Sequence, residues 1–196
     1  RGKDAYTTDH FPSQENVVAH VRLADIVTAD GKEILLLDEL QSDVHKAGSK
    51  FGYQDSKSTG GIDPKQAPQV PFQQRKGSGW AQLGIKRALM EAAEKDYDTL
   101  AMTTAQQQVD RYDHLSNVID FKGFYQRYDK DYIKILNKFG KKYGQEVEMI
   151  EVLQGDEIVE VPSINLTEEW KNDIQRGLPQ FNKGGKVLKK LKRNCA

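Results

Sequence analysis

The sequence has few of the features that would assign it to a class at once. It contains a single cysteine, Cys195, so no disulfide can form within the chain, which fits a reducing compartment or one where disulfides are unused. No apolar run approaches the roughly 18 residues that a membrane span requires, and the first residues do not resemble a signal peptide. Neither sign of charge is in excess, because 29 basic side chains balance 29 acidic ones. A general nucleic-acid-binding protein usually has a basic surplus, so this balance argues against that class.

The length of 196 residues predicts one domain of ordinary size. A chain of this length buries about 70% of the surface that its unfolded form exposes, so it needs no metal or disulfide to fold. We expect an N-terminal extension at residues 1–15, a single α/β domain at 16–182 and a basic tail at 183–196. The chain does not begin with Met, and we expect it to be a processed product or the C-terminal part of a larger one.

An N-terminal hairpin is the first predicted element of the fold. Apolar and polar residues alternate over 16–23, which is the period of a strand. Asp30-Gly31 follows, a dipeptide typical of tight hairpin turns. The return strand at 34–37 is apolar throughout, so both of its faces should be covered.

The remaining pattern predicts a mixed sheet of about five strands with two long helices. Helical spacing of apolar residues over 80–95, followed by an apolar strand at 99–104, indicates a crossover and therefore a parallel strand pair. The second long helix is expected at 121–143. A long polar loop at 54–71 is the best candidate for a mobile lid. Shorter elements are a helix near 44–47, a polar helix at 105–112, strands at 146–152 and 157–161, and a helix at 166–174.

Directly after the return strand comes a dense group of polar side chains. Ligand sites in open α/β sheets lie at the carboxyl ends of strands, so this group is the candidate catalytic centre. Glu39 or Asp43 would act as a general base with His45 as its partner. A metal ion held by Asp43, His45 and His20 is a second interpretation, and a wet surface with a helix cap is a third. The candidate catalytic residues are Glu39, Gln41, Ser42, Asp43 and His45.

A second polar group follows the strand at 99–104, so we expect it beside the first. Arg111 is suited to bind a phosphate or carboxylate. A capped helix with a wet polar face is the competing interpretation. His20 and Arg22 share one face of the first strand and complete the candidate ligand-binding set, although an inward Arg22 paired with an acid is more often structural. That set is His20, Arg22, Thr103, Thr104, Gln107, Arg111 and Tyr112.

Three further stretches carry weaker signals. The glycines of 77–79 precede a helix, where a phosphate can bind. Residues 82–89 loosely resemble the coenzyme A pyrophosphate loop of the GNAT acyltransferases, but Ala81 and Lys86 depart from its pattern at both anchor positions. The segment Lys183–Arg193 has six basic residues and no acid, and it is either a solvated tail or a contact for an acidic or nucleic-acid partner.

Several stretches together resemble a domain of the large polyvalent and internal virion proteins of tailed phages. The most specific are Glu39-Leu-Gln-Ser-Asp43 and the Thr-Thr-x-x-Gln-x-x-x-Arg-Tyr stretch at 103–112. The similarity extends over most of 10–182, with further matches at 16–22, 122–125 and 177–181. It implies a phage origin and other virion proteins as partners. Val44 and Lys46 stand where similar proteins often have Trp and Gln.

Two functions follow as expectations. The first is a phage virion or polyvalent-protein domain, packaged or delivered into the host cytoplasm, with a binding or assembly role. The second is a group-transfer enzyme, acyltransferase-like, that uses Glu39, Asp43 and His45 near Arg111. No cofactor is assigned. An enzyme should bring the two polar groups together beside a cavity, whereas an assembly module should leave them apart.

Overall fold

The fold is organised around an antiparallel hairpin of two long strands, β1 (His20–Val27) and β2 (Glu33–Gln41). A computed structural model describes residues 6–8, 10–54, 66–73, 79–112 and 121–177. After the hairpin come α1 (Asp43–Phe51) and α2 (Gly79–Glu94), followed by β3 (Thr99–Met102) and α3 (Ala105–Tyr112). The remaining elements are α4 (Lys122–Gln126), η2 (Arg127–Tyr132), α5 (Ile133–Gly140), η3 (Lys141–Tyr143), β4 (Glu148–Gln154), β5 (Glu157–Asn165) and α6 (Glu168–Gln175).

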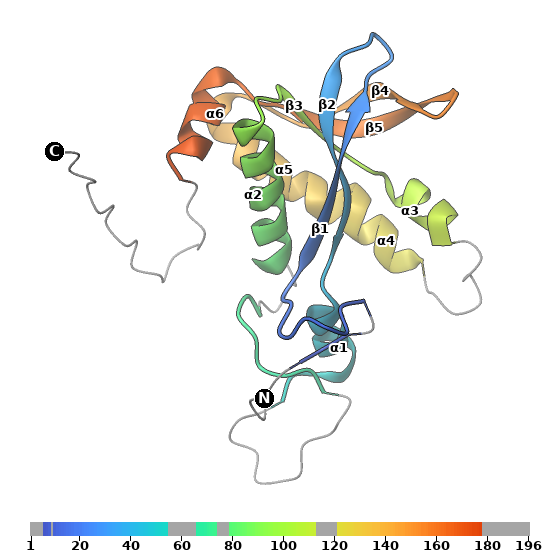
Figure 1. The fold of residues 1–196 in the computed structure, drawn as a ribbon, viewed down its shortest axis with the longest axis vertical. Helices are drawn as coiled ribbons and strands as arrows, with labels where there is room; N and C mark the ends of the chain where they lie inside the picture. Colours follow the sequence, from blue (N-terminus) through green and yellow to red (C-terminus); the bar gives the residue numbers. More distant parts are fainter. Residues whose placement is uncertain (1–5, 9, 55–65, 74–78, 113–120, 178–196) are drawn as a thin grey trace, which may run out of the picture.

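The strands form one mixed five-stranded sheet in the order β1-β2-β3-β5-β4, as expected for an α/β domain. β2 and β3 are parallel, with Leu35 opposite Leu100, and α2 makes the crossover between them. All other neighbours are antiparallel. In Figure 1 the β1–β2 hairpin runs almost vertically, whereas β4 and β5 cross behind it near its tip.

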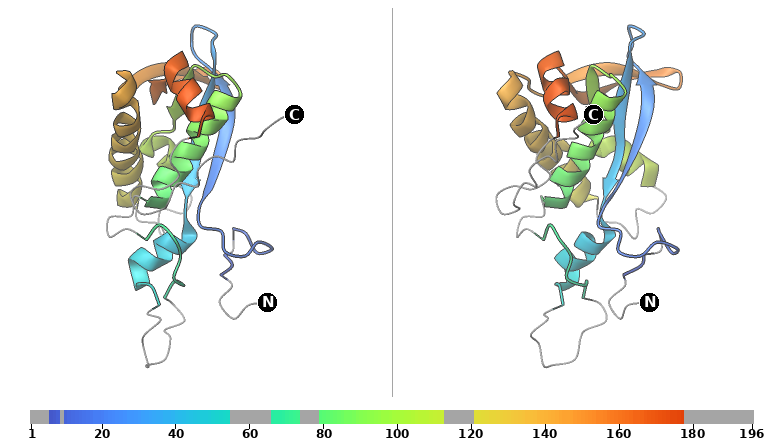
Figure 2. Two further views of the ribbon diagram at one scale, coloured as in Figure 1. Left: turned by 90° about the vertical axis from the view of Figure 1, so that its left-hand side faces the viewer. Right: turned by 60° about the vertical axis from the view of Figure 1, so that its left-hand side comes forward.

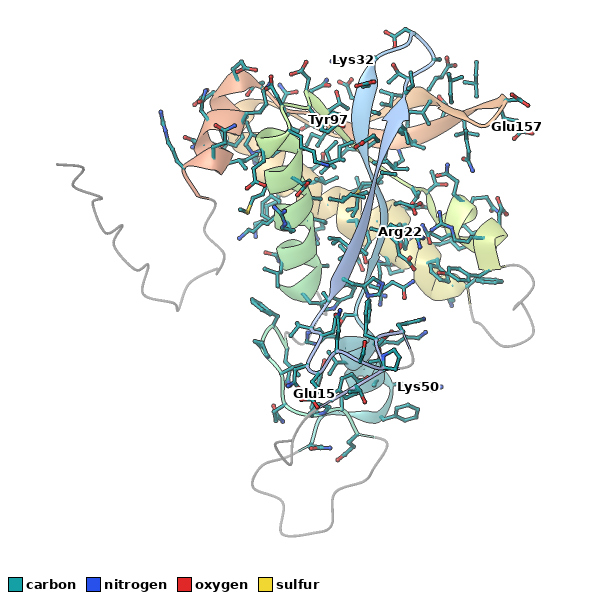
Figure 3. The ribbon with its side chains drawn as sticks, in the orientation of Figure 1. Glu15, Arg22, Lys32, Lys50, Tyr97 and Glu157 are labelled. Carbon is teal, nitrogen blue, oxygen red and sulfur yellow. The ribbon has the colours of Figure 1, made fainter. Side chains whose placement is uncertain are left out.

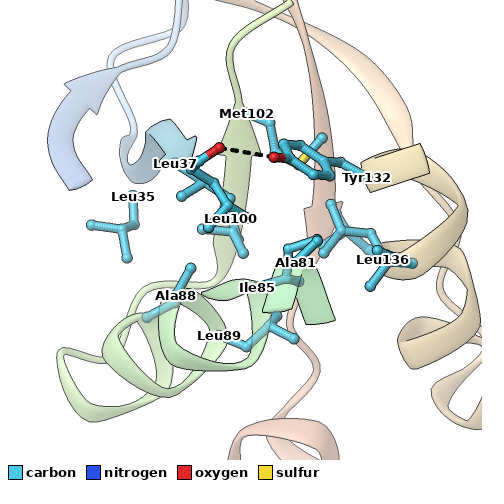
Figure 4. Close-up of a cluster of buried hydrophobic side chains, with 14 of the residues drawn as sticks. Leu35, Leu37, Ala81, Ile85, Ala88, Leu89, Leu100, Met102, Tyr132 and Leu136 are labelled. Atoms are coloured by element: carbon cyan, nitrogen blue, oxygen red, sulfur yellow. Dashed lines mark hydrogen bonds between the residues drawn. The ribbon is translucent and has the colours of Figure 1, made fainter. Parts of the chain in front are cut away.

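One face of the sheet carries the main hydrophobic core. Helices α2, α5 and α6 lie on this side, as the left view of Figure 2 shows. Leu35 and Leu37 of β2 pack there with Leu100 of β3 and Leu89 of α2 (Figure 4). A Cβ at Gly84 would lie 2.3 Å from the Leu40 Cδ1 atom, so the absence of a side chain at Gly84 lets α2 approach the sheet closely.

The other face is concave and holds a smaller cluster. Thr28, just after β1, forms an antiparallel bridge with Val152 of β4, although β1 and β4 are the two edge strands. The Ala29 amide also donates to the Glu151 carbonyl at 3.0 Å. The sheet is therefore curled toward closure around a small apolar cluster. The buried members of that cluster are Ile34, Ala101, Val152 and Val161.

Several expected boundaries differ from those observed. β1 begins at His20 rather than residue 16, because residues 16–19 precede the paired register. The helix expected at 121–143 is interrupted by a π-helical turn at Arg127–Tyr132, which changes the direction of its aromatic side chains. Of the predicted lid, only residues 54 and 66–71 are described, and the Gln54 amide donates to the Ala67 carbonyl at 2.8 Å. In the described part of the chain, no helix has the length and apolar character to cross a bilayer.

Candidate functional site

A β-bulge in β2 directs two adjacent acids to the same face of the sheet. Arg22 lies opposite Glu39, but the next residue, Leu23, lies opposite Leu37, so Asp38 is the extra residue. Leu37 and Leu40 both pack in the main core, which leaves Asp38 and Glu39 together on the concave side. Neighbouring residues of a regular strand would point to opposite faces. The bulge therefore creates a pair of carboxylates that the alternation of the strand does not allow.

Asp38 joins two arginines from distant parts of the chain. The Arg111 Nη2 atom of α3 lies 2.5 Å from Asp38 Oδ1, and the Arg22 Nε atom of β1 donates to Asp38 Oδ2. Burial acts to raise the pKa of Asp38, but the hydrogen bonds from Arg111 and Arg22 outweigh it and hold that pKa below its usual range. The Asp38 carboxylate is 15% exposed, and the side chains of Arg22 and Arg111 are 49% and 34% exposed. Both guanidiniums can therefore offer N–H groups to a ligand while Asp38 holds them in place.

Glu39 is the buried acid of the pair. Its Oε2 atom lies 2.9 Å from Arg22 Nη2, and its Oε1 atom accepts hydrogen bonds from the Tyr112 hydroxyl at 3.0 Å and from Gln41 Nε2. Burial raises the pKa of Tyr112, and the hydrogen bond to Glu39 raises it further. A carboxylate hydrogen-bonded to a phenol, at the end of a strand, is a pair that can accept and return a proton. Figure 3 labels Arg22 midway along β1, on the side of the hairpin toward α3.

Side chains close the free edge of β2 beyond the point where β3 leaves it. The Asp38 carbonyl accepts from Thr103 Oγ1 at 2.9 Å and from Gln108 Nε2 at 2.7 Å. The Tyr132 hydroxyl donates to the Leu40 carbonyl at 2.8 Å, and the Leu40 amide donates to the Tyr128 hydroxyl at 3.4 Å. These bonds satisfy backbone groups that a neighbouring strand would otherwise pair, and they hold the bulge in position.

A groove of about 400 Å³ opens on the concave face beside this cluster. Its floor is aliphatic, and Asp38 and Arg111 line it together with Thr103. Gln107 bridges from α3 to β4, because its Nε2 atom donates to Gln154 Oε1 at 2.9 Å. Ligand pockets commonly combine an apolar lining with a few fixed polar groups. The floor residues are Ile26, Leu36, Val152, Val159 and Val161.

The structure brings together only some of the predicted residues. One network around Asp38 contains five of them: Glu39, Gln41, Arg22, Arg111 and Tyr112. A sixth, Thr103, contacts the network because its hydroxyl donates to the Asp38 carbonyl. The remaining second-group residues, Thr104 and Gln107, cap α3, since Gln107 Oε1 accepts from the Thr104 amide at 2.8 Å.

The other predicted residues of the first group belong to helix α1. Ser42 caps that helix and accepts from the His45 amide at 3.3 Å, and Asp43 in its first turn lies 3.0 Å from His10. His45 is buried in a separate cluster, where its Nδ1 atom lies 2.7 Å from the Tyr53 hydroxyl and its ring stacks on Trp80. No contact joins His45 to Glu39 or Arg111 in the described part of the structure. The expectation of His45 as the partner of Glu39 is therefore wrong, because α1 turns the imidazole away from the concave face.

His20, rather than His45, interacts electrostatically with Glu39. Burial lowers the pKa of His20, while the negative charges of Glu39 and Asp43 act to raise it. Its ring packs against Phe11 with the ring centroids 5.0 Å apart. Among the described residues, no three His, Cys, Asp or Glu side chains are grouped to hold a metal ion, so the metal interpretation has no site there.

Sequence reasoning missed three residues that shape this site. Gln108 is fully buried and binds the Asp38 carbonyl, yet it was not distinguished from its polar neighbours on α3. Tyr128 and Tyr132 lie in the helix predicted at 121–143 and were not singled out. Their hydroxyls gave a usable signal, because a buried tyrosine needs a hydrogen-bond partner. Gly77 and Ser78 lie outside the described residues, and Gly84 of α2 packs against Leu40 of β2 instead of facing a ligand.

Searches of protein-family models, curated proteins and solved structures found no match to this chain.

Proposed function

We propose that this domain is a group-transfer enzyme whose centre is the Asp38–Glu39 bulge. The observation that supports the proposal is convergence: carboxylates from β2 and guanidiniums from β1 and α3 meet beside a groove with an aliphatic floor. The chain segments that provide them are separated by up to 89 positions, from Arg22 to Arg111. The pKa of Asp38 is lowered and that of Tyr112 is raised, and ionisable groups perturbed in this way beside a groove are typical of catalytic centres.

Each residue of the network has a definable role in such a reaction. Glu39 accepts the proton of the attacking nucleophile, and Tyr112, which is hydrogen-bonded to Glu39, passes a proton to the leaving group. Arg22 and Arg111 bind an anionic part of the donor, with Asp38 fixing their positions. For an acyl thioester and an amine, the N–C bond forms, the C–S bond breaks, and the proton leaves the amine for Glu39 while the thiol is released.

Native mass spectrometry of the purified protein identifies ligands that co-purify, and thiol release from acetyl-coenzyme A with a panel of amines tests acyl transfer. We expect Glu39→Gln to abolish turnover; because the variant also loses a buried ion pair with Arg22 and should be less stable, circular dichroism at the assay temperature checks that it is still folded. Glu33→Gln, on the exposed end of the same strand, is the matched control and should retain activity. Unchanged turnover in Glu39→Gln and Asp38→Asn, or the absence of both a ligand and turnover, would remove the enzymatic proposal in favour of a structural ion-pair network.

A second candidate is a virion or polyvalent-protein domain of a phage, with a binding or assembly role. It rests on the resemblance of the stretches at 39–43 and 103–112 to phage proteins, whereas the contact between them through Glu39 and Tyr112 is the arrangement expected of an enzyme. Other virion proteins would be the partners, and the virion or the host cytoplasm the location. Peptide mapping of purified virions tests this. Peptides of the domain should be found there, covalently part of a longer product, and their absence from virions would contradict the role.

A further inference from the structure

The β4–β5 hairpin is strongly acidic and faces solvent. Residues 144–163 contain six acids and no lysine or arginine. None of these six acids makes an ion pair with another residue in the described part of the chain. Figure 3 labels Glu157 at the turn of this hairpin, where it projects beyond the helices. The six acids are Glu146, Glu148, Glu151, Asp156, Glu157 and Glu160.

One face of the hairpin combines this charge with exposed aliphatic groups. Leu153 lies opposite Ile158, and their exposed fractions are 44% and 58%. One step further along the same face Glu151 lies opposite Glu160, and beyond them Met149, which is 52% exposed, lies opposite Pro162. Like charges directly opposite each other destabilise a strand pair, and exposed apolar side chains gain free energy when covered. This ladder of apolar, acidic and apolar pairs therefore fits a basic amphipathic partner.

We propose that this face binds residues 183–193 of the same chain. That segment carries six basic residues and no acid, so its charge is opposite to that of the hairpin, where Glu151 and Glu160 lie on this face. Val187, Leu188 and Leu191 lie between the basic residues and provide aliphatic groups for Met149, Leu153 and Ile158. The partner for the basic tail is thus an acidic surface of its own molecule rather than a nucleic acid, whose phosphates the hairpin would repel.

The chain is long enough to make this contact. The described residues end at Gly177, and the ten residues from there to Val187 span up to about 35 Å when extended. β5 has nine residues and leads almost directly into α6, so its length is about 30 Å. The segment can therefore return along β5 to reach the exposed pairs. Binding would neutralise Glu151 and Glu160 together.

Cys195, the single cysteine, permits a direct test in the full-length protein. A nitroxide spin label on Cys195 broadens the NMR signals of amides near the tail. We expect selective loss of signal intensity at 149–160. The loss should disappear in Glu151→Lys/Glu160→Lys and in about 1 M salt, where the screening length falls to about 3 Å. Glu169→Lys, at an exposed position of α6 that makes no ion pair among the described residues, is the control and should leave the broadening unchanged.

A charge exchange keeps the proposal testable if the acidic variant folds poorly. Lys189→Glu/Lys190→Glu should abolish the broadening, and combining it with Glu151→Lys/Glu160→Lys should restore it. Broadening spread evenly over the surface, or insensitive to these changes, would overturn the proposal. The last control is a mixture of two samples. One carries the spin label but no ¹⁵N, and the other is enriched in ¹⁵N but carries no spin label. Selective broadening in that mixture would place the tail on a second copy and would also overturn it.

Discussion

The Arg111 guanidinium lies 2.5 Å from the Asp38 carboxylate, although 73 positions separate the two residues in the chain. This contact joins α3 to the bulge of β2 and brings the two polar groups of the sequence into one cluster. Because Arg22 shares the same carboxylate, Asp38 organises cations from two different elements. The contact leads to a prediction about acid stability.

Replacing Asp38 should weaken the fold most at neutral pH. Asp38→Asn removes a partly buried charge partner of two arginines, and we expect the free energy of unfolding to fall by about 1–3 kcal/mol. The folded-state pKa of Asp38 is depressed, so its contribution is present above the unfolded value of about 3.9 and is lost as the pH falls through the folded value. Urea unfolding of both proteins, measured from about pH 2 to about pH 7, should show that acidification lowers the free energy of unfolding less in the variant than in the parent protein. Equal acid sensitivity would contradict the role of Asp38.

The Tyr132 hydroxyl should contribute measurably to stability. Tyr132→Phe leaves the buried Leu40 carbonyl without its donor, which costs about 1–3 kcal/mol. Tyr128→Phe should cost less, because its hydrogen bond to the Leu40 amide is longer at 3.4 Å. Tyr125→Phe, at a 40% exposed position, is the matched control with little expected change. Thermal and urea unfolding provide the measurement, and equal effects at Tyr125 and Tyr132 would contradict the prediction.

His45 should make the fold less stable in mild acid. Burial lowers its pKa in the folded protein, so the unfolded chain binds the proton more readily. Stability should therefore fall as the pH drops below about 6.5, the value for an unfolded histidine, toward the folded pKa. His45→Phe keeps a ring on Trp80 but cannot titrate, so it should reduce this slope, while the partly buried His20 maintains part of it. The measurement is the free energy of unfolding between about pH 5 and about pH 7. If its dependence on pH is the same in the variant as in the parent protein, the prediction is contradicted.

Gly84 should be intolerant of a side chain. In Gly84→Ala the new methyl group would meet Leu40 Cδ1 at 2.3 Å, and overpacking of this kind costs about 1–3 kcal/mol. Leu40→Val removes the nearest atoms, so the double variant should recover part of the loss. Gly123→Ala is the control, since no atom lies within 4 Å of that position. Melting temperatures in which the Leu40→Val and Gly84→Ala effects simply add would contradict the proposed contact.

The fold could be predicted further than the site. Apolar periodicity and the Asp30-Gly31 turn were sufficient for the hairpin, the crossover helix and the mixed sheet, because these elements depend on local pattern. The bulge at Asp38 was not predictable in this way. It arises where Leu37 and Leu40 must both enter the core, and this places Asp38 beside Glu39. The position of His45 was equally unpredictable from the sequence, because only the orientation of α1 separates its side chain from Glu39.

The sequence by itself determined the α/β class, the order of the main elements and the polar character of two strand ends, because periodicity and turn residues act over a few positions. Tertiary structure alone decided which of those polar residues meet. That outcome depends on the register of β1 against β2, on the curl that joins Thr28 to Val152, and on the π-helical turn that directs Tyr132 toward Leu40. These three features depend on how distant parts of the chain pack together, so no short stretch of sequence predicts them.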